Sequence, residues 1–363
     1  MAKLEIEIQT RIMLKPSTPT PNHLRTLKLS LFYELAPHAY VPVLFHYLPS
    51  NTEGTITERC DKLQKSLAQT LTKVFPIAGR LIEGDFSIHC NDKGIEYVET
   101  KANADLAEFL HQGPNTELLN DFLPWPSTVP PYSDLPSTPL LAVQVNLFNC
   151  GGLVIAIQIS HIVADAFTLA TFLNEWANTS LTGKTKDCLP SFGHLSSLFP
   201  TTLRSGTQFL PPSNRGPKTI TRRFLWAFPP PNMDSSFVVL INMRGKSNLP
   251  CLEDDALGNC TMSGIANLEA EKELNHELVG NTIRDTYMCR HCSWCGFPWY
   301  KVNFGWGKPF WVSSVSFDAL ELICLMDTKN GDGIEAWVSL KENVMAEFER
   351  DAEILTFCSP LPK

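Results

Sequence analysis

The clearest pattern in the chain is an alternation of apolar and polar side chains that runs toward a histidine. Residues 140–148 alternate, and an almost wholly apolar run covers residues 154–159. The turn Asn149-Cys-Gly-Gly152 separates the two runs, which predicts a β-hairpin whose second strand is largely buried. Residues 165–179 then have helical periodicity. His161 therefore lies where a buried strand ends and a helix begins.

Shorter patterns precede this hairpin. The alternation from Leu4 to Leu14 predicts a strand, and the apolar spacing from Thr57 to Val74 predicts an amphipathic helix that ends before a proline. Phe86–His89 and Ile95–Thr100 are predicted to be strands on either side of the turn Asn91-Asp-Lys-Gly94.

The second half of the chain has a weaker pattern. From Thr182 to Lys218 it is rich in Pro, Ser, Thr and Gly, which predicts a long crossover between two domains. A final helix is predicted from Glu342 to Leu355. The strands predicted beyond the crossover are Phe237–Met243, Phe310–Ser316, Leu320–Met326 and Glu335–Leu340.

Composition bounds the size and class of the protein. The chain has 363 residues and is 44% hydrophobic, which is too long for one ordinary core and suggests two domains. Its charged fraction is 19% and its formal net charge is −8. An acidic protein without a stripe of Lys and Arg is a poor general binder of nucleic acid, because phosphate contacts need clustered positive charge. We therefore expect no nucleic-acid partner.

The eleven cysteines are scattered without a disulfide framework. Cys292 and Cys295 form a C-x-x-C pair, but no second pair at zinc-ribbon spacing accompanies it, so reduced thiols are favoured over a metal site. Residues 1–10 contain no apolar signal-peptide core, and no run approaches the ~18 apolar residues of a membrane span. The sequence thus predicts a cytosolic protein with no bound metal and no membrane partner.

The pentapeptide His161-Ile-Val-Ala-Asp165 is the first candidate for chemistry. A histidine at the end of a buried strand is held rigidly, and its neutral imidazole can accept a proton from a substrate hydroxyl near pH 7. The H-x-x-x-D pattern alone is weak, because the histidines of a chain this size produce about one chance match. The alternative is a core histidine that is followed by an ordinary helix cap.

The segment Asn303-Phe-Gly-Trp-Gly-Lys-Pro309 is the second candidate. Two glycines around a tryptophan, ended by a proline, predict a tight turn with close backbone approach. Taken alone, this pattern favours a purely structural loop.

Together the two segments resemble the signatures of the plant BAHD acyltransferases, H-x-x-x-D and D-F-G-W-G. Further matches follow the family's order over nearly the whole chain, so the set is far more specific than either signature. They are Phe75-Pro-Ile-Ala-Gly-Arg80, Asn91-Asp-Lys-Gly94 (which resembles the turn of the family's early hairpin), Asn242-Met-Arg244, Gly258-Asn259, Cys292-Ser-Trp-Cys295, Met326-Asp-Thr328 and Gly333-Ile-Glu-Ala-Trp337. The segments Pro19-Thr-Pro21, Asn149-Cys-Gly-Gly152 and Gly331-Asp-Gly333 resemble the family's branch of alkaloid O-acetyltransferases.

The resemblance implies an α/β fold of two chloramphenicol acetyltransferase-like domains, with mixed sheets flanked by helices and a channel between the domains. The expected boundaries are 1–185 for the N-terminal domain, 186–220 for the crossover loop and 221–363 for the C-terminal domain. It also implies a monomeric acyl-CoA-dependent O-acyltransferase with no permanently bound cofactor. The favoured co-substrate is acetyl-CoA, and the acceptor is a small plant metabolite such as an alkaloid.

The resemblance also implies a role for each matching residue. His161 would be the general base that takes the acceptor's proton as its oxygen attacks the thioester, without a covalent acyl-enzyme. Asp165 would be structural and paired with Arg244. Trp294 would be a candidate donor to the thioester oxygen. The loop residues that would support the channel wall are Asn303, Phe304, Gly305, Trp306 and Gly307.

The chain departs from the family pattern in two places. Asn303 stands where the family has Asp, and the loss of a charge-assisted bond to a Lys or Arg would cost ~1–3 kcal/mol. The stretches from Phe228 to Phe237 and from Gly264 to His291 are shorter than in the family, where they carry a strand and helices of the C-terminal domain. We therefore expect a shortened C-terminal half that has lost core elements.

Two other functions compete with the acyltransferase. A catalytically impaired or inactive relative, from a truncated gene or splice form, would explain the short C-terminal half. A hydrolase that uses His161 as the base for water is disfavoured, because the chain has no G-x-S-x-G elbow. For an active enzyme, sugar, terpenoid and phenolic acceptors remain open beside an alkaloid.

Overall fold

The computed structural model divides the chain into two compact units. Unit 1 comprises residues 1–211, 244–260 and 297–315, and unit 2 comprises residues 212–243, 261–296 and 316–363. The structure describes the whole chain except residues 1–3, 35, 37–38, 51–53, 83–84, 114–115, 126–136, 187–191, 193–218, 225–234, 243–256, 258–260, 269–286, 317–320 and 353–363. Each unit contains its own six-stranded sheet.

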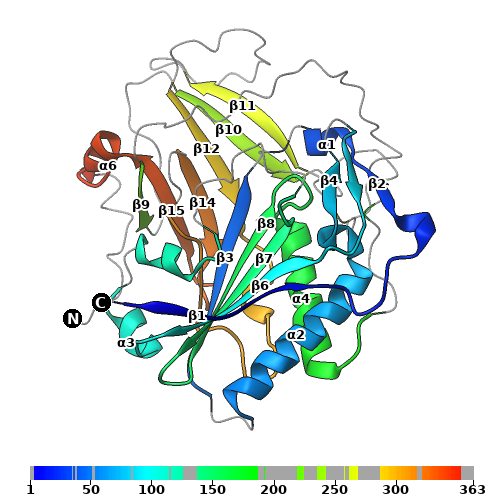
Figure 1. The fold of residues 1–363 in the computed structure, drawn as a ribbon. Coiled ribbons are helices and arrows are strands. Elements are labelled where there is room, and N and C mark those ends of the chain that lie inside the picture. The colour runs from blue at the N-terminus through cyan, green and yellow to red at the C-terminus, as the bar shows by residue number, and fades with distance from the viewer. Residues whose placement is uncertain are drawn as a thin grey trace. The chain divides into compact units, whose positions relative to one another are not determined.

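The sheet of unit 1 is formed by β1 (Ile6–Leu14), β3 (Tyr40–Tyr47), β6 (Ile95–Ala102), β7 (Leu141–Phe148), β8 (Leu153–Ser160) and β13 (Trp311–Ser313). Their order is β1-β6-β7-β8-β3-β13, and Figure 1 shows β1, β6, β7, β8 and β3 in this arrangement. β6 and β7 run parallel, and the other neighbouring pairs are antiparallel. The predicted hairpin is confirmed as β7 and β8, and β8 is buried along its whole length.

Two long helices, α2 (Ile56–Lys73) and α4 (Ala166–Thr182), lie side by side against the sheet of unit 1 (Figure 1). Thr55 and Glu58 form a capping box that starts α2. The apolar face of α2 buries Leu63, Leu67 and Leu71 completely, and each such side chain stabilises the fold by roughly 1.5–3 kcal/mol. The shorter helical segments of unit 1 are α1 (Leu31–Glu34), α3 (Leu106–His111), and the 3-10 turns η1 (Asn22–Leu24), η2 (Phe75–Ala78), η3 (Leu118–Phe122) and η5 (Trp299–Lys301).

A small second sheet in unit 1 consists of β2 (Thr26–Lys28), β4 (Arg80–Ile82) and β5 (Ser87–His89), in the order β2-β5-β4. Strands are present on both sides of the 91–94 turn, as predicted, but the expected hairpin is wrong. β5 pairs with β2 and β4, whereas β6 pairs with β1 and β7. The turn therefore passes the chain from one sheet to another.

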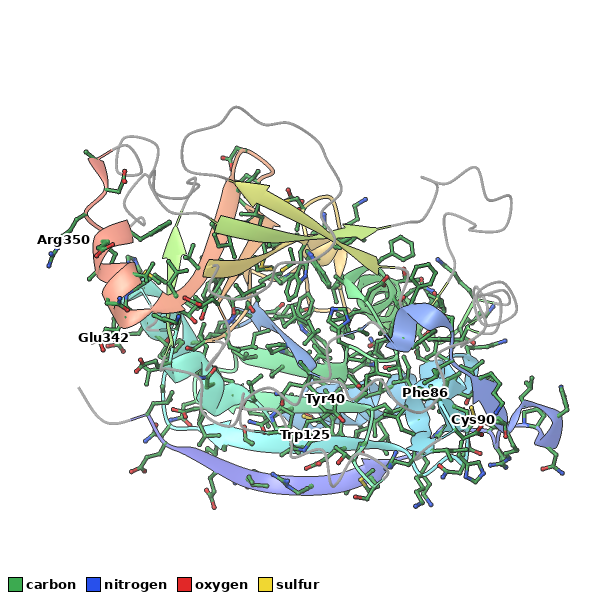
Figure 2. All side chains as sticks on the ribbon, turned by 90° about the horizontal axis from the view of Figure 1, so that it is seen from above. Tyr40, Phe86, Cys90, Trp125, Glu342 and Arg350 are labelled. Atoms are coloured by element: carbon green, nitrogen blue, oxygen red, sulfur yellow. The ribbon has the colours of Figure 1, made fainter. Side chains whose placement is uncertain are left out.

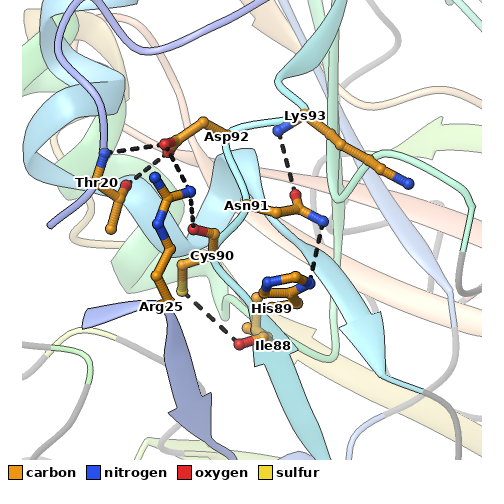
Figure 3. A network of polar contacts seen from close by, with 8 residues as sticks. All are labelled: Thr20, Arg25, Ile88, His89, Cys90, Asn91, Asp92 and Lys93. Atoms are coloured by element: carbon orange, nitrogen blue, oxygen red, sulfur yellow. Dashed lines mark hydrogen bonds and ion pairs between the residues drawn. The ribbon is translucent and has the colours of Figure 1, made fainter. Parts of the chain in front are cut away.

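Asp92 explains why this turn changes sheets (Figure 3). Its carboxylate accepts hydrogen bonds from the backbone N–H of Thr20 at 2.9 Å and from the Thr20 hydroxyl at 2.6 Å, and it pairs with Arg25 at 3.1 Å. Gly94 has a φ of +89°, and a Cβ there would lie 2.5 Å from the carbonyl oxygen of Leu14. The turn is thus fixed to the N-terminal segment and packed against the end of β1, which only glycine allows.

The sheet of unit 2 is formed by β9 (Thr219–Phe224), β10 (Ser235–Asn242), β11 (Thr261–Leu268), β12 (Tyr287–Ser293), β14 (Leu322–Asp327) and β15 (Ile334–Lys341). Their order is β11-β10-β12-β14-β15-β9. The helix α6 (Glu342–Phe348) packs against β15 and contributes Met345 and Phe348 to a cluster with Ile323, Val338 and Leu340.

Three strands of unit 2 differ from the sequence prediction. β9, β11 and β12 are not predicted by any clear alternation, and β11 lies where the family pattern implies helices. Among the described residues the sheets of both units contain six strands, and the expected loss of core elements relative to the family remains a prediction. The short segments of this chain therefore do not leave the second sheet with fewer strands than the first.

One late segment belongs to unit 1. β13 pairs with β3, with Trp311 opposite His46, and residues 297–315 group with unit 1. The predicted C-terminal domain runs without interruption from 221 to 363, so the observed units differ from it at this point. A strand pairing across more than half the chain is non-local, and local periodicity cannot predict it.

We predict that the backbone amides of β7 and β8 exchange more slowly than those of β14 and β15. β8 is buried at every position and β7 at nearly every position, whereas the described apolar cluster of unit 2 is small. Native-state hydrogen exchange of the purified chain, read by mass spectrometry, measures both. Equal, strong protection in the two hairpins would contradict this prediction and show that the core of unit 2 is as stable as that of unit 1.

Candidate active site

His161 lies directly after β8, where the chain turns toward α4. Its backbone N–H donates to the carbonyl oxygen of Ala39 at 2.8 Å, which ties it to the start of β3. The carbonyl oxygen of Ser160 accepts from the backbone N–H groups of Val163 and Ala164 at 3.1 and 3.3 Å. These bonds close a tight turn and leave the His161 side chain half-buried.

Asp165 begins α4. Its Oδ1 accepts a hydrogen bond from the backbone N–H of Thr168 at 2.9 Å, so Asp165 is the N-cap of the helix. The carboxylate is 5% exposed and lies at the positive end of the helix dipole. The predicted ion pair with Arg244 remains a prediction, because Arg244 lies outside the described residues.

Burial decides the charge of His161. Removal of the imidazole from water lowers its pKa below the ordinary value of 6.5, while the nearby charge of Asp165 acts in the opposite direction. The lowered pKa leaves the ring neutral at neutral pH. A neutral, rigidly held imidazole can accept a proton, which is the chemistry of a general base.

The strand end below His161 is braced by two aromatic residues. Tyr40 is paired with Ser160 across β3 and β8, and its hydroxyl donates to the carbonyl oxygen of Pro139 at 2.7 Å. Its ring meets Trp125 edge to face at 4.9 Å, and Figure 2 shows the two side by side. The backbone N–H of Trp125 donates to Gln158 on β8 at 3.1 Å. Burial raises the pKa of Tyr40 well above its usual range, so its hydroxyl remains a donor.

Helix α4 links His161 to the glycine loop. Asn174 donates through Nδ2 to the carbonyl oxygen of Pro298 at 3.3 Å, and the Ser180 hydroxyl donates to the carbonyl oxygen of Phe304 at 3.0 Å. Both bonds lie within unit 1. The H-x-x-x-D segment (residues 161–165) therefore lies at the start of α4, and the glycine loop (residues 303–309) is hydrogen-bonded near the end of the same helix.

Asn303 organises the glycine loop from within. Its Oδ1 accepts from the backbone N–H groups of Gly305 and Gly307 at 2.9 and 3.1 Å, and these glycines have φ angles of +117° and +112°. Asn303 thus holds the loop as a neutral acceptor, without the charge of the family's Asp. Lys62 lies beside this loop, with its Nζ 2.8 Å from the position that a Cβ of Gly305 would occupy.

The aromatic residues of the loop pack inside unit 1. Trp306 stacks on Phe304 at 5.7 Å and meets Tyr47 edge to face at 6.2 Å, and Arg59 lies 5.9 Å from the Trp306 ring. Phe304 also meets Trp176 of α4 at 4.6 Å. Arg59, Lys62 and Ser180 were missed from the sequence, since nothing local in α2 or α4 signals contact with a loop more than a hundred residues away.

Trp294, the candidate oxyanion donor, lies in unit 2 just after β12. It is 6% exposed, and its backbone N–H donates to the carbonyl oxygen of Leu325 at 2.7 Å. Its proposed contact with a thioester oxygen remains a prediction.

The described residues contain no cluster of three or more His, Cys, Asp or Glu that could hold a metal ion. Cys292 and Cys295 carry free thiols, and Cys292 lies opposite Cys324 in the β12–β14 pair. Across the same residues, no helix has the length and apolar character needed to cross a membrane.

The chain is similar to known proteins over nearly its whole length. A model of the Transferase family matches residues 4–212 and 284–355. The chain is 31% identical to acetyl-CoA-benzylalcohol acetyltransferase of Clarkia breweri, over 98% of this chain and 100% of the relative. It is 30% identical to epi-neemfruitin B synthase L1AT of Melia azedarach, over 98% and 99%. The crystal structure of vinorine synthase superposes with a TM-score of 0.82 at 26% identity, over 98% and 99% of the two chains.

The chain belongs to the plant BAHD family of acyltransferases, and it has that family's two-domain α/β fold. It is an acyltransferase that takes its acyl group from acyl-CoA. The expected shortening has a counterpart in these matches. The family match is interrupted between residues 212 and 284, and the alignment with the Melia protein spans 437 positions although the chain has 363 residues.

We predict that Asn303→Ala destabilises unit 1 and that Asn303→Asp does not. Alanine leaves the backbone N–H groups of Gly305 and Gly307 without their acceptor, which should cost about 1–3 kcal/mol of unfolding free energy. Aspartate keeps the acceptor and places a carboxylate near Lys62, so the unfolding free energy should stay equal or rise by up to ~1 kcal/mol. Urea unfolding of the two variants measures the difference. A loss in Asn303→Asp as large as that in Asn303→Ala would contradict the assigned role.

Proposed function

We propose that this protein transfers an acetyl group from acetyl-CoA to a hydroxyl of a small plant specialised metabolite, with an alkaloid as the favoured acceptor. The observation that carries the proposal is the state of His161. It is half-buried at a strand end that is hydrogen-bonded on both sides, and burial lowers its pKa. An imidazole with a lowered pKa is uncharged at neutral pH. It is therefore poorly suited to a structural ion pair and well suited to accept a proton.

In the proposed mechanism, the neutral imidazole of His161 accepts the proton of the acceptor hydroxyl as its oxygen attacks the thioester carbonyl carbon. A tetrahedral oxyanion forms, and the indole N–H of Trp294 is the candidate donor to it. The oxyanion then collapses, the carbon–sulfur bond breaks, and the departing thiolate takes the proton from the imidazolium. The products are the acetyl ester and free CoA, and His161 is again neutral.

Asp165 acts indirectly in this mechanism. Its carboxylate caps α4 through Thr168 and is thereby committed to the helix end. Through that cap it holds the turn that presents His161, and its charge moderates the imidazole pKa. We therefore assign Asp165 a positioning role and no proton transfer.

The donor and acceptor are assigned by analogy with named relatives. The name of the Clarkia protein specifies acetyl-CoA and an alcohol acceptor, which supports acetyl transfer to a hydroxyl. The similarity to vinorine synthase over nearly the whole chain supports an alkaloid as the favoured acceptor. The cytosolic location and the monomeric state remain predictions that accompany this proposal.

A second candidate is a catalytically inactive relative. The observation that favours it is the interruption of the family match between residues 212 and 284, which falls largely in unit 2. If the missing family segments carry the acyl-CoA side of the channel, turnover would fail although His161 is intact.

We predict that His161→Ala lowers turnover by about 10² or more, because the acceptor hydroxyl loses its general base. The assay follows CoA release from acetyl-CoA, with a panel of alkaloid, benzylic, terpenoid and phenolic alcohols. His111→Ala, which removes an exposed imidazole on α3, is the matched control and should retain normal turnover. Both variants should melt near the temperature of the parent chain.

Two outcomes would overturn parts of this proposal. A folded His161→Ala variant with near-normal kcat would remove His161 as the base. A folded parent chain that releases no CoA with any acceptor would support the inactive alternative.

A further inference from the structure

A cavity of about 350 Å³ lies at the β1 edge of the unit 1 sheet, away from the residues assigned to catalysis. Its volume falls in the range of small-molecule sites, about 300–1,000 Å³. Ile8 pairs with Thr100, and the register between β1 and β6 shifts just after Ile8. This irregularity brings both Ile8 and Arg11 to the cavity, where a regular strand would turn one of them away.

A buried amide below the cavity has only one possible orientation. Nδ2 of Asn146 donates to the carbonyl oxygens of Phe122 and Val154, both at 3.1 Å. A carbonyl oxygen can only accept, so the amide nitrogen must face these two groups. The Oδ1 of Asn146 therefore faces the other way, where it accepts from the Thr100 hydroxyl at 2.8 Å and from Nε2 of Gln144 at 2.9 Å.

This chain of bonds also orients Gln144. Because Asn146 offers it an acceptor, Gln144 must present its amide nitrogen there and keep Oε1 on the other side. Gln144 is 4% exposed and lines the cavity. Among the described residues, no group donates to its Oε1. This fixed acceptor is therefore open to the cavity, where a donor group of a ligand could bind it in place of water.

The charges around the cavity select the sign of that ligand. The guanidinium of Arg11 is paired with Glu96 at 2.5 Å, and the second carboxylate oxygen of Glu96 accepts from the Trp125 indole at 2.8 Å. Arg11 is therefore already neutralised. The exposed carboxylate of Asp121 also lines the cavity and adds negative charge. This combination disfavours anions, including the phosphates of acyl-CoA, and favours a positively charged donor.

We propose that this cavity binds a small protonated amine with an apolar body. Its ammonium group donates to Oε1 of Gln144 and to the Asp121 carboxylate, and its body packs against Ile6, Ile8 and Leu123. The site lies apart from His161 and requires no assumption about the reaction. It would give the protein a second binding function for cationic metabolites.

The test compares three probes of the same shape and different charge on the full-length chain: benzylamine, benzyl alcohol and benzoate. Isothermal titration calorimetry measures each dissociation constant. We expect benzylamine to bind most tightly, benzyl alcohol at least fivefold more weakly, and benzoate not measurably.

Two variants localise the binding. Asp121→Asn removes the charge from an exposed position and should weaken benzylamine at least fivefold while leaving benzyl alcohol unchanged. Ile8→Trp fills the cavity from a side chain that is 54% exposed, and it should weaken both probes. His161→Ala is the matched control for binding at the predicted active site and should leave benzylamine affinity unchanged.

The proposal is overturned if benzoate binds as well as benzylamine, or if Asp121→Asn leaves benzylamine affinity unchanged. It is also overturned if benzylamine affinity is lost in His161→Ala and kept in Ile8→Trp, which would place the ligand at the active site. If Ile8→Trp does not fold, the Asp121→Asn result decides alone. An inactive acyltransferase that still binds benzylamine in this pattern supports the cavity and refutes only the proposed function.

Discussion

The hydrogen bond from the Thr168 backbone to the Asp165 carboxylate fixes the point at which β8 becomes α4. A buried strand cannot end freely, because its last polar groups and the first N–H groups of the next helix need partners. Here the carbonyl oxygen of Ser160 satisfies two N–H groups of the turn, and Asp165 satisfies one of the helix. His161 is held between these two anchors, and its half-buried position lowers its pKa.

The same helix carries the second signature of the family. Ser180 at its far end binds the carbonyl oxygen of Phe304, and Asn303 closes the glycine loop with two bonds to backbone N–H groups. All of these contacts lie in unit 1, whereas the interruption of the family match falls largely in unit 2. The described contacts that hold His161 and the glycine loop therefore lie outside the part of the chain where the family match is interrupted.

The sequence predicts the elements whose burial follows a simple period. β7, β8, α2 and α4 alternate or repeat cleanly, and each lies within a few residues of its predicted bounds. β11 and β12 were missed because Gly264 interrupts one run and Arg290 and His291 interrupt the other. The 91–94 turn was taken for a hairpin, since its contacts with Thr20 and Arg25 are not local.

For the candidate site, the sequence indicates His161 and Asp165 as candidates but does not indicate what surrounds them. The roles of Tyr40, Trp125 and Ser180 depend on strands and helices that meet only in the folded chain. The use of Asn303 as an internal acceptor was also not predicted, because its bonds to the backbone N–H groups of Gly305 and Gly307 depend on the folded shape of the loop.

The most direct test of this account is the titration of the His161 imidazole by NMR, with the histidine side chains isotopically labelled and the His161→Ala spectrum used for assignment. We predict a midpoint below 6.5, so that the ring is protonated only under acid conditions and serves as a base above its pKa. Asp165→Asn keeps the N-cap but removes the negative charge, so its midpoint should be lower still. A midpoint at or above 6.5, or one that rises in Asp165→Asn, would contradict a base whose neutrality is set by burial.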